Sequence, residues 1–265
     1  MAAKESGHQM SGIIADTAYK QYEKRLTKEV LSGPVPEHIA IIMDGNRRFA
    51  REIGLGTGDG HKEGRNKLEE LLYWGLETGV KILTVYAFSS ENFTRDSEEV
   101  KELMKLFEEN FYKVGDDKRV HQHQIRIRAL GMLKMLPDEV QKAILYAEDK
   151  TKKYDKYFLN LAVAYSGREE IINAIKEISA QVKGGDLRIE DINQDMFSKY
   201  LYTADLPDPD LILRTSGEVR VSNFLLWQLA YSELYFVDVY WPGFRKIDYL
   251  RAIRSYQQRV RRYGR

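Results

Sequence analysis

The chain has 265 residues, a formal net charge of +1, 31% charged and 43% hydrophobic residues, and no cysteine. These values predict a soluble globular protein with one large α/β domain or two smaller ones, and they exclude disulfides, thiol catalysis and cysteine-ligated zinc. The near-zero charge gives no reason to expect a nucleic-acid partner. No apolar run reaches the ~18 residues of a membrane-spanning helix, and the N-terminus lacks a signal-peptide pattern, so we expect a cytoplasmic location.

The N-terminal segment, residues 1–33, contains a predicted amphipathic helix at 13–31 that ends before Ser32-Gly33-Pro34. We expect it to pack an apolar stripe on the following domain; the stripe is Ile14, Ala18, Tyr22, Leu26 and Val30. The basic residues between these positions favour a second interpretation, in which the helix makes peripheral contact with a membrane surface or covers a site entrance.

The most informative stretch begins at His38. An apolar run to Met43 ends at Asp44-Gly45-Asn46, and two arginines follow at once. This pattern predicts a buried strand, a tight turn and the start of a helix. A carboxylate at such a strand end, beside a glycine and free helix N–H groups, suits metal and phosphate chemistry, although Asp44 could also simply cap the helix.

The rest of the chain alternates between strand and helix patterns. Further strands are predicted at 81–88, 124–130, 157–164, 211–213 and 234–238. Helices are predicted at 61–78, from Asp96 through Val114, at 137–153, 168–182, 191–201, 223–230 and 246–263. This alternation predicts a single α/β domain with a mainly parallel, doubly wound six-stranded sheet and right-handed crossovers.

Polar loops follow three of these strands, at 44–48, 89–95 and 214–222. Because ligands of parallel sheets bind at the carboxyl ends of the strands, we expect the loops to converge. They would surround one carboxylate with several arginines, which suit bidentate contact with phosphate oxygens. The pattern therefore predicts a site for one or two diphosphate ligands with Mg²⁺, although a lone arginine is most often a solvated surface residue.

Five segments occur in the order and at the spacing of a known family. They are HIAIIMDGNRRFAR (38–51), GHKEG (60–64), YAFSSENFTR (86–95), DLILRTSGE (210–218) and SNFLLWQLAYSELYF (222–236). Together they resemble the cis-prenyltransferases, the family of undecaprenyl and dehydrodolichyl diphosphate synthases. The resemblance covers residues 34–264. It implies a catalytic domain at 34–265, an apolar tunnel, a homodimer, and an Mg²⁺-dependent enzyme that joins isopentenyl diphosphate to an allylic prenyl diphosphate with a cis double bond.

The resemblance also implies roles for individual residues. Asp44 would be catalytic and hold Mg²⁺, and Asn92 would assist proton removal. The allylic diphosphate would be held by Gly45, Asn46, Arg47, Arg48 and His61, above a hydrophobic floor at Phe49. The neighbouring wall would consist of Ser89, Ser90, Glu91, Phe93 and Arg95, and the isopentenyl diphosphate would bind Arg214, Arg220 and Ser222. Glu233 matches a position linked to metal binding or to the dimer-proximal part of the site, with a surface salt bridge as the alternative.

The C-terminal tail Arg262-Tyr263-Gly264 resembles a tail that crosses the dimer in some members, with a basic solvated helix end as the alternative.

The chain departs from many family members at a few positions. Several bacterial members have Gly at the place of Arg47, Trp at Phe49 and Arg at Thr57, and some relatives have His at Val219. Bulky or polar residues at 108–112, if they face inward, would shorten the tunnel, so we predict a short or medium product. Two rival functions stay open: a prenyltransferase with an unusual acceptor (a second allylic diphosphate or an alcohol), and the non-catalytic subunit of a heteromeric prenyltransferase.

Overall fold

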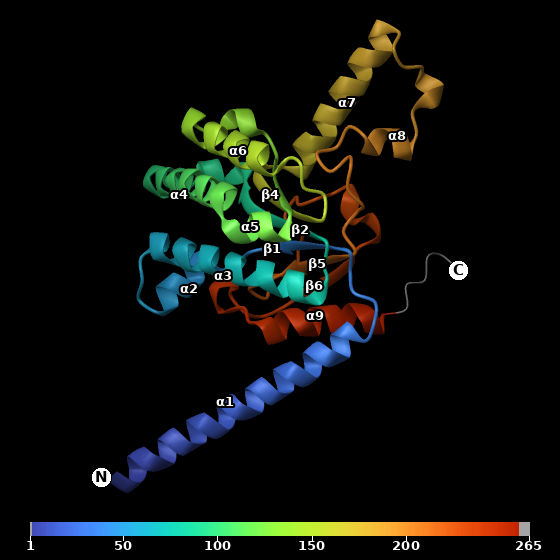
Figure 1. The fold of residues 1–265 in the computed structure, drawn as a ribbon. Helices are drawn as coiled ribbons and strands as arrows, with labels where there is room; N and C mark the ends of the chain where they lie inside the picture. Colours follow the sequence, from blue (N-terminus) through green and yellow to red (C-terminus); the bar gives the residue numbers. More distant parts are fainter. Residues whose placement is uncertain (1, 260–265) are drawn as a thin grey trace.

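The computed structural model describes residues 2–259, with side chains from Thr17 onward. Its centre is one sheet of six parallel strands in the order β3-β4-β2-β1-β5-β6 (Figure 1). The strands are β1 (His38–Ile42), β2 (Ile82–Ser89), β3 (Ile125–Leu130), β4 (Tyr157–Tyr165), β5 (Leu211–Arg214) and β6 (Glu233–Phe236). The predicted fold class is confirmed, and every strand pair in the described part of the chain is parallel.

The helices lie mainly on one face of this sheet, so the doubly wound arrangement expected from the sequence, with helices on both faces, is not observed. They are α1 (Ala2–Leu31), α2 (Asn46–Glu52), α3 (Thr57–Thr78), α4 (Ser97–Asp116), α5 (Lys118–His123), α6 (Asp138–Thr151), α7 (Gly167–Gly184), α8 (Gln194–Ser198) and α9 (Lys246–Gln258). Alternate residues of β1 point to opposite faces. Ile39 and Ile41 join the large core cluster under α3, α4, α6 and α9, whereas Ala40 and Ile42 join a smaller cluster with Phe224.

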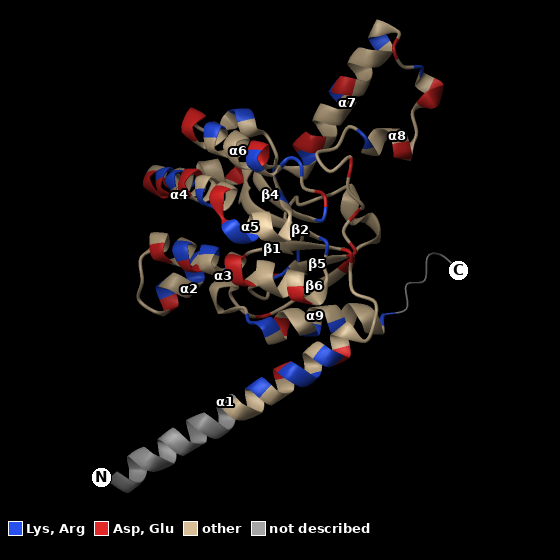
Figure 2. Cartoon of the chain, viewed as in Figure 1, with Lys and Arg blue, Asp and Glu red and all other residues tan. Residues whose placement is uncertain are grey.

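Helix α1 is longer than predicted, and only its second half confirms the expected packing. Leu26 and Val30 are buried in the large core cluster, and Arg251 of α9 lies over the ring of Tyr22. Ala18 is exposed, and the side chain of Ile14 lies outside the described residues. The described part of α1 carries interleaved basic and acidic residues (Figure 2). The domain boundary at 33/34 stays a prediction.

Three predicted elements differ in the structure. The predicted helix at 223–230 is only a 3-10 turn, Gln228–Tyr231, because Ser222, Asn223 and Leu225 adopt left-handed φ angles of 47°, 62° and 45° that interrupt any helix. Helix α3 begins at Thr57 rather than at residue 61. The predicted helix at 191–201 consists of the 3-10 turn Ile189–Asp191 and the short α8.

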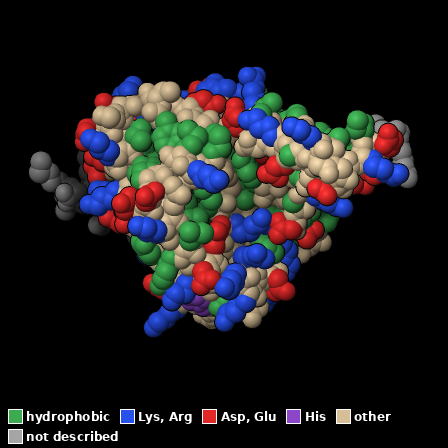
Figure 3. All heavy atoms as spheres, turned by 90° about the horizontal axis from the view of Figure 1, so that it is seen from above, with side chains coloured by type: hydrophobic (Ala, Val, Ile, Leu, Met, Phe, Trp, Pro, Cys, Tyr) green, Lys and Arg blue, Asp and Glu red, His purple; other side chains and the backbone are tan. Residues whose placement is uncertain are grey.

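No helix in the described residues is long and apolar enough to cross a membrane. Figure 3 shows hydrophobic side chains gathered in a patch at the upper left of one face of the molecule, several basic side chains close together near the centre of that face, and other charged side chains scattered around them.

A series of hydrogen bonds between buried polar side chains crosses the centre of the sheet. His38 is fully buried, and its Nδ1 donates to the Pro207 carbonyl at 2.7 Å, so its Nε2 accepts from the Thr84 hydroxyl at 2.8 Å. Asn160 Nδ2 in turn donates to Thr84 Oγ1 at 2.9 Å. These contacts join β1, β2 and β4. Because burial disfavours the charged ring, the pKa of His38 is lowered to about 4.

Candidate active site

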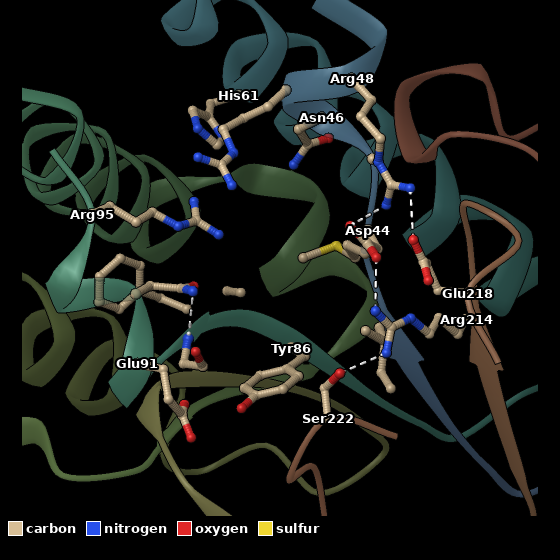
Figure 4. Close-up of a pocket in the computed structure, with 18 of the residues that line it drawn as sticks. Asp44, Asn46, Arg48, His61, Tyr86, Glu91, Arg95, Arg214, Glu218 and Ser222 are labelled. Atoms are coloured by element: carbon tan, nitrogen blue, oxygen red, sulfur yellow. Dashed lines mark hydrogen bonds and ion pairs between the residues drawn. The ribbon is translucent and has the colours of Figure 1, made fainter. Parts of the chain in front are cut away.

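A pocket of about 870 Å³ lies at the carboxyl ends of β1, β2 and β5. All three predicted loops contribute to it, so 44–48, 89–95 and 214–222 converge as expected (Figure 4). The convergence follows from the strand order, because β2 and β5 lie on either side of β1. The centre of this sheet is therefore where a ligand of a parallel α/β protein is expected.

Asp44 lies between two guanidinium groups. Its Oδ2 is 2.8 Å from Arg214 Nη2 and its Oδ1 is 3.1 Å from Arg48 Nη2. The backbone N–H of Asp44 donates to Thr215 Oγ1 at 2.9 Å, which ties the turn to the end of β5. Burial alone would raise the pKa of Asp44, but hydrogen bonds from Arg214 and Ser216 and the charges of Arg214 and Arg48 outweigh it and hold the pKa below its usual value. The carboxylate is therefore ionised at neutral pH.

Arg214 closes the loop 214–222 on itself. Its Nη1 donates to the Arg220 carbonyl and to Ser222 Oγ, both at 2.7 Å, and its side chain is 4% exposed. Between these contacts Ser216 and Gly217 both have left-handed φ angles, 79° and 73°. The left-handed φ of Gly217 favours glycine, and a Cβ there would also lie 2.6 Å from Asp238 Oδ1, so the Asp238 side chain would have to shift.

Glycines also let the turn after β1 approach α3 and the segment around Tyr240. Gly45 has a φ of 107°, and a Cβ there would lie 2.7 Å from the Tyr240 ring. A Cβ at Gly64 of α3 would lie 2.6 Å from Asn46 Oδ1. That oxygen is buried without a hydrogen-bond partner, which is unusual for a buried acceptor.

On the other side of the pocket, a second acid pairs with three basic side chains. Glu99 of α4, 12% exposed, accepts from Arg95 Nη1 at 2.9 Å, from His61 Nε2 at 3.2 Å and from Arg47 Nη1 at 3.5 Å. Burial lowers the pKa of His61, and it outweighs the opposing effect of the Glu99 contact. Asp96 caps α4 by accepting from the backbone N–H groups of Glu98 and Glu99, and the Glu99 side chain pairs with three basic residues that line the pocket.

Most of the predicted site residues line this pocket. They are Asp44, Gly45, Asn46, Arg47, Arg48, His61, Ser89, Glu91, Asn92, Arg95, Arg214, Arg220 and Ser222. Asn92 Oδ1 accepts from the Ser89 N–H at 3.1 Å, which orients its carboxamide. Phe49, Ser90 and Phe93 do not line the pocket; Phe93 instead packs edge-on against Phe88, with ring centroids 4.9 Å apart.

Sequence reasoning did not single out Tyr86, Glu218 and Asn223, which also line the pocket. All three lie inside the segments that resemble the family, but nothing in their charge or spacing marked them. Tyr86 stacks on Phe224 with centroids 4.6 Å apart, so its position depends on a long-range contact that the sequence does not reveal.

Glu233 is not brought to Asp44 within one chain. It opens β6 and aligns with Leu211 and, through it, with Ile39, near the amino ends of the strands. Its carboxylate pairs with Arg259 instead. Its assignment as a metal ligand stays a prediction that would need a second chain. The tail Arg262-Tyr263-Gly264 lies outside the described residues.

A second, apolar cavity of about 100 Å³ lies between α3 and α4 and is lined by residues such as Leu72, Phe107, Phe111 and Leu161. Phe107 packs edge-on at 6.0 Å against Phe88, which lines the first pocket. The two apolar regions therefore adjoin at this pair of rings, beside the helix where the sequence places the wall of the tunnel.

Of the residues suspected of shortening the tunnel, two line this cavity. They are Asn110 and Phe111. Glu109 and Tyr112 are exposed.

An ionised carboxylate surrounded by guanidinium groups, with an apolar cavity close by, defines an α/β enzyme that handles the diphosphate ester of an apolar molecule. Comparisons with known proteins agree with this class. Residues 42–264 match the family model described as "Putative undecaprenyl diphosphate synthase". The chain belongs to this family, and the predicted cis-prenyltransferase class is confirmed.

Similar curated proteins come from archaea. The chain is 57% identical to the "Tritrans,polycis-undecaprenyl-diphosphate synthase (geranylgeranyl-diphosphate specific)" of Methanopyrus kandleri, over 93% of this chain and 91% of that protein. It is 52% identical to the protein of the same name from Methanocaldococcus jannaschii, over 96% of this chain and 90% of that protein.

Two solved structures share the fold. Lavandulyl diphosphate synthase from Lavandula x intermedia, in complex with dimethylallyl diphosphate, is 39% identical with a TM-score of 0.84 and covers 87% of this chain and 99% of its own. A probable undecaprenyl diphosphate synthase from Campylobacter jejuni is 32% identical with a TM-score of 0.71. The match covers 88% of this chain and 100% of the Campylobacter jejuni chain.

Proposed function

We propose that this chain elongates geranylgeranyl diphosphate with isopentenyl diphosphate and releases a Z-polyprenyl diphosphate of medium, undecaprenyl-like length. The reaction class follows from the family. The starter and the length are supported by the names of the relatives from Methanopyrus kandleri and Methanocaldococcus jannaschii, at 57% and 52% identity. The observation that carries the proposal is the position of Asp44 between Arg48 and Arg214, in a pocket next to an apolar cavity.

The pocket divides into two groups of donors around Asp44. The turn residues Asn46 and Arg48, with His61, would hold the allylic diphosphate. Arg214 and Arg220, from the loop after β5, would hold the isopentenyl diphosphate. This division is supported by the elements that carry the donors, because Asn46 and Arg48 belong to α2 and His61 to α3, whereas Arg214 ends β5 and Arg220 follows it.

The chemistry requires charge to move onto a leaving group. The C–O bond of the allylic diphosphate breaks, and the electron pair leaves with the diphosphate. The double bond of isopentenyl diphosphate adds to the allylic cation, and loss of a proton to the departed diphosphate anion gives the new cis double bond. The arginines would stabilise the charge on the leaving diphosphate and hold both substrates in register. Phe88 and Leu103 would shield the cation from water, and Asn92 would face the carbon that loses the proton.

Mg²⁺ is part of this proposal. Within the described residues no three His, Asp or Glu side chains form a metal site by themselves. Asp44 nevertheless fits an ion that arrives with a diphosphate, because Mg²⁺ is commonly held by one or two carboxylates together with phosphate oxygens and waters. Such an ion would neutralise charge on the leaving diphosphate. To bind the ion, Asp44 would break its ion pair with Arg48 more readily than its ion pair with Arg214, because the Arg48 side chain is 39% exposed and the Arg214 side chain only 4%.

Product analysis tests the proposal directly. The purified chain is incubated with Mg²⁺, labelled isopentenyl diphosphate, and dimethylallyl, farnesyl or geranylgeranyl diphosphate, and the products are identified by mass spectrometry. We expect geranylgeranyl diphosphate to be the best starter, and Asp44→Ala to lower kcat by at least about a hundredfold, because the ionised carboxylate is lost. Absence of product with every starter would refute the proposed function.

The acceptor alternative is less well supported. It was motivated by Thr57, which replaces a family arginine, but Thr57 does not line the main pocket and lies in the adjoining cleft between α3 and α4. New prenylated products formed without isopentenyl diphosphate would support this alternative. The non-catalytic alternative conflicts with the presence of Asp44, Asn92, Arg214 and Arg220 in one pocket.

We also propose a homodimer and peripheral membrane contact. Exposed Ile172 and Ile175 lie on α7, which projects from the body of the molecule and offers an apolar surface to a second copy (Figure 1). Exposed Lys24, Arg25 and Lys28 of α1 would contact anionic lipids. Light scattering and sedimentation with anionic vesicles test these two proposals, and a monomer or an absence of vesicle binding would contradict them.

A further inference from the structure

Glu218 occupies an unusual position for an acid in a diphosphate pocket. Its Oε1 is 2.9 Å from Arg48 Nη1, and its Oε2 is 2.6 Å from Arg220 Nη1. Figure 4 shows the contact between Glu218 and Arg48. Arg48 belongs to α2 and Arg220 to the loop after β5, so one carboxylate bridges donors from the two sides of the pocket.

These contacts use the N–H groups that a diphosphate would need. A guanidinium group keeps its charge at all accessible pH values and binds carboxylate and phosphate oxygens with the same geometry. A diphosphate oxygen that approaches from the same side therefore competes with a Glu218 oxygen for the N–H group of Arg48 Nη1 or Arg220 Nη1 that points to the carboxylate. Both arginines are partly exposed, 39% and 58%, so the exchange does not require core residues to move.

The backbone holds Glu218 at this place. Ser216 and Gly217, directly before it, have left-handed φ angles, and Arg214 closes the loop from inside through the Arg220 carbonyl and Ser222. The Glu218 side chain itself is 32% exposed, so it can rotate toward solvent while the loop stays in place. The neighbouring Arg220 and Arg48 keep the pKa of Glu218 below its usual value, so the competing group is a full negative charge.

We infer that Glu218 is an internal counter-anion that occupies the diphosphate donors of Arg48 and Arg220 between turnovers and competes with diphosphate for them. This inference rests on the proposed function and adds a release step to it. The carboxylate keeps the two like-charged groups together when no ligand is bound. It also returns to them when inorganic diphosphate leaves, so it lowers the affinity for that product and speeds its release.

The test measures binding without turnover. Calorimetry with inorganic pyrophosphate, in the absence and presence of Mg²⁺, is carried out on the wild type and on Glu218→Gln, Glu218→Asp and Glu91→Gln. Glu91 is the matched control: it lines the same pocket, but its carboxylate accepts from Asn223 Nδ2 at 3.0 Å and from Ser90 Oγ at 3.2 Å rather than from an arginine.

We expect Glu218→Gln to bind pyrophosphate about tenfold more tightly, because a competing charge beside two guanidinium groups is removed. Glu218→Asp keeps the charge and should stay closer to the wild type. Glu91→Gln should change the affinity less than Glu218→Gln does. In the condensation assay, Glu218→Gln should lower both KM for isopentenyl diphosphate and kcat, because product release slows.

The sign of the change separates this role from a structural one. If Glu218 merely positions Arg48 and Arg220, Glu218→Gln will bind pyrophosphate more weakly, and that result, or an unchanged affinity, overturns the inference. Unchanged thermal unfolding of the variant shows that it is folded. A wild-type chain that binds pyrophosphate but makes no prenyl product would refute the proposed function, whereas the binding comparison would still decide the role of Glu218.

Discussion

At the scale of single residues, Arg214 differs from the other arginines of the pocket. It is buried and donates at once to Asp44, to the Arg220 carbonyl and to Ser222. Arg47, in contrast, is 53% exposed and makes one long contact with Glu99, at 3.5 Å. A planar fork of donors can satisfy several acceptors at fixed angles, whereas an ammonium group cannot. Arg214 therefore both holds the loop and orients Asp44.

This difference predicts unequal effects of the same substitution. Arg214→Lys should lower kcat/KM by about a hundredfold and the free energy of unfolding by about 2 kcal/mol, because buried acceptors lose their donors. Arg47→Lys should lower kcat/KM by less than about tenfold and leave stability unchanged, because an exposed contact contributes little. Steady-state kinetics and urea unfolding of both variants check this. Equal effects of the two substitutions would contradict the special role of Arg214.

The sequence predicted Asp44 and the arginine-rich loops because loops after parallel strands meet at one edge of the sheet. It did not predict that Glu99 would join His61, Arg95 and Arg47, since that depends on how the first turn of α4 faces α3. Glu233 directly precedes the strand predicted at 234–238, so a parallel sheet places it at the amino ends of the strands, away from the three loops. How the side chains of one helix face another helix depends on tertiary packing, which local patterns do not encode.

At the scale of elements, long periodic segments were predicted well and irregular ones were not. The buried strand β1 and the amphipathic α4 have clear apolar patterns that match their burial. The segment 223–230 is equally apolar, yet its left-handed residues make it a series of turns over the smaller core cluster. Apolar periodicity reports burial, and here burial occurred without a helix.

Helix α4 also carries a prediction about product length. Phe111, 2% exposed, lines the apolar cavity of about 100 Å³ beside α3. Phe111→Leu should enlarge this cavity and lengthen the main product, because the growing chain can extend further before it meets a wall. The same change should cost about 1 to 2 kcal/mol of stability, since a large buried side chain is shortened. Mass spectrometry of the product distribution gives the measurement.

Phe244→Leu is the matched control for this prediction. Phe244 is also fully buried in the large core cluster, but it packs against Trp241 and Trp74 rather than lining the apolar cavity. It should lower stability by a similar amount without changing the product. A shift of length in both variants would mean that general loosening of the core, not the cavity wall, determines the product.

At the scale of the whole molecule, the sheet order explains how distant segments form one site. Strands β2, β1 and β5 are neighbours, although β5 lies about 170 residues after β1 in the chain, as the 170-residue separation of Asp44 and Arg214 shows. The buried hydrogen bonds of His38, Thr84 and Asn160 join β1 and β2 to β4. The strand that leads to Asp44 therefore begins at a buried histidine, and the stability of the site is linked to the protonation of that ring.

This link predicts that the free energy of unfolding decreases as the pH falls. In the unfolded chain a histidine titrates near its usual value of about 6.5, whereas the pKa of His38 in the folded protein is about 4. The unfolded state therefore binds the proton more tightly. The contribution of His38 to stability is fully present above pH ~6.5 and declines as the pH falls toward 4. The total loss is about 3 kcal/mol, from 1.36 kcal/mol per unit of pKa difference.

Urea unfolding of the wild type and of His38→Gln between pH 7 and pH 4 measures the pH-dependent contribution of His38 to stability. The variant should be less stable at pH 7, because the contacts with Pro207 and Thr84 are altered, but its stability should fall less steeply below pH 6.5. Carboxylates and other histidines, His61 among them, contribute to both curves and cancel in the difference between them. His123→Gln, at the end of α5 and outside the core clusters, should keep the wild-type slope. Parallel curves for the wild type and His38→Gln over this pH range would show that the buried ring is not the group responsible.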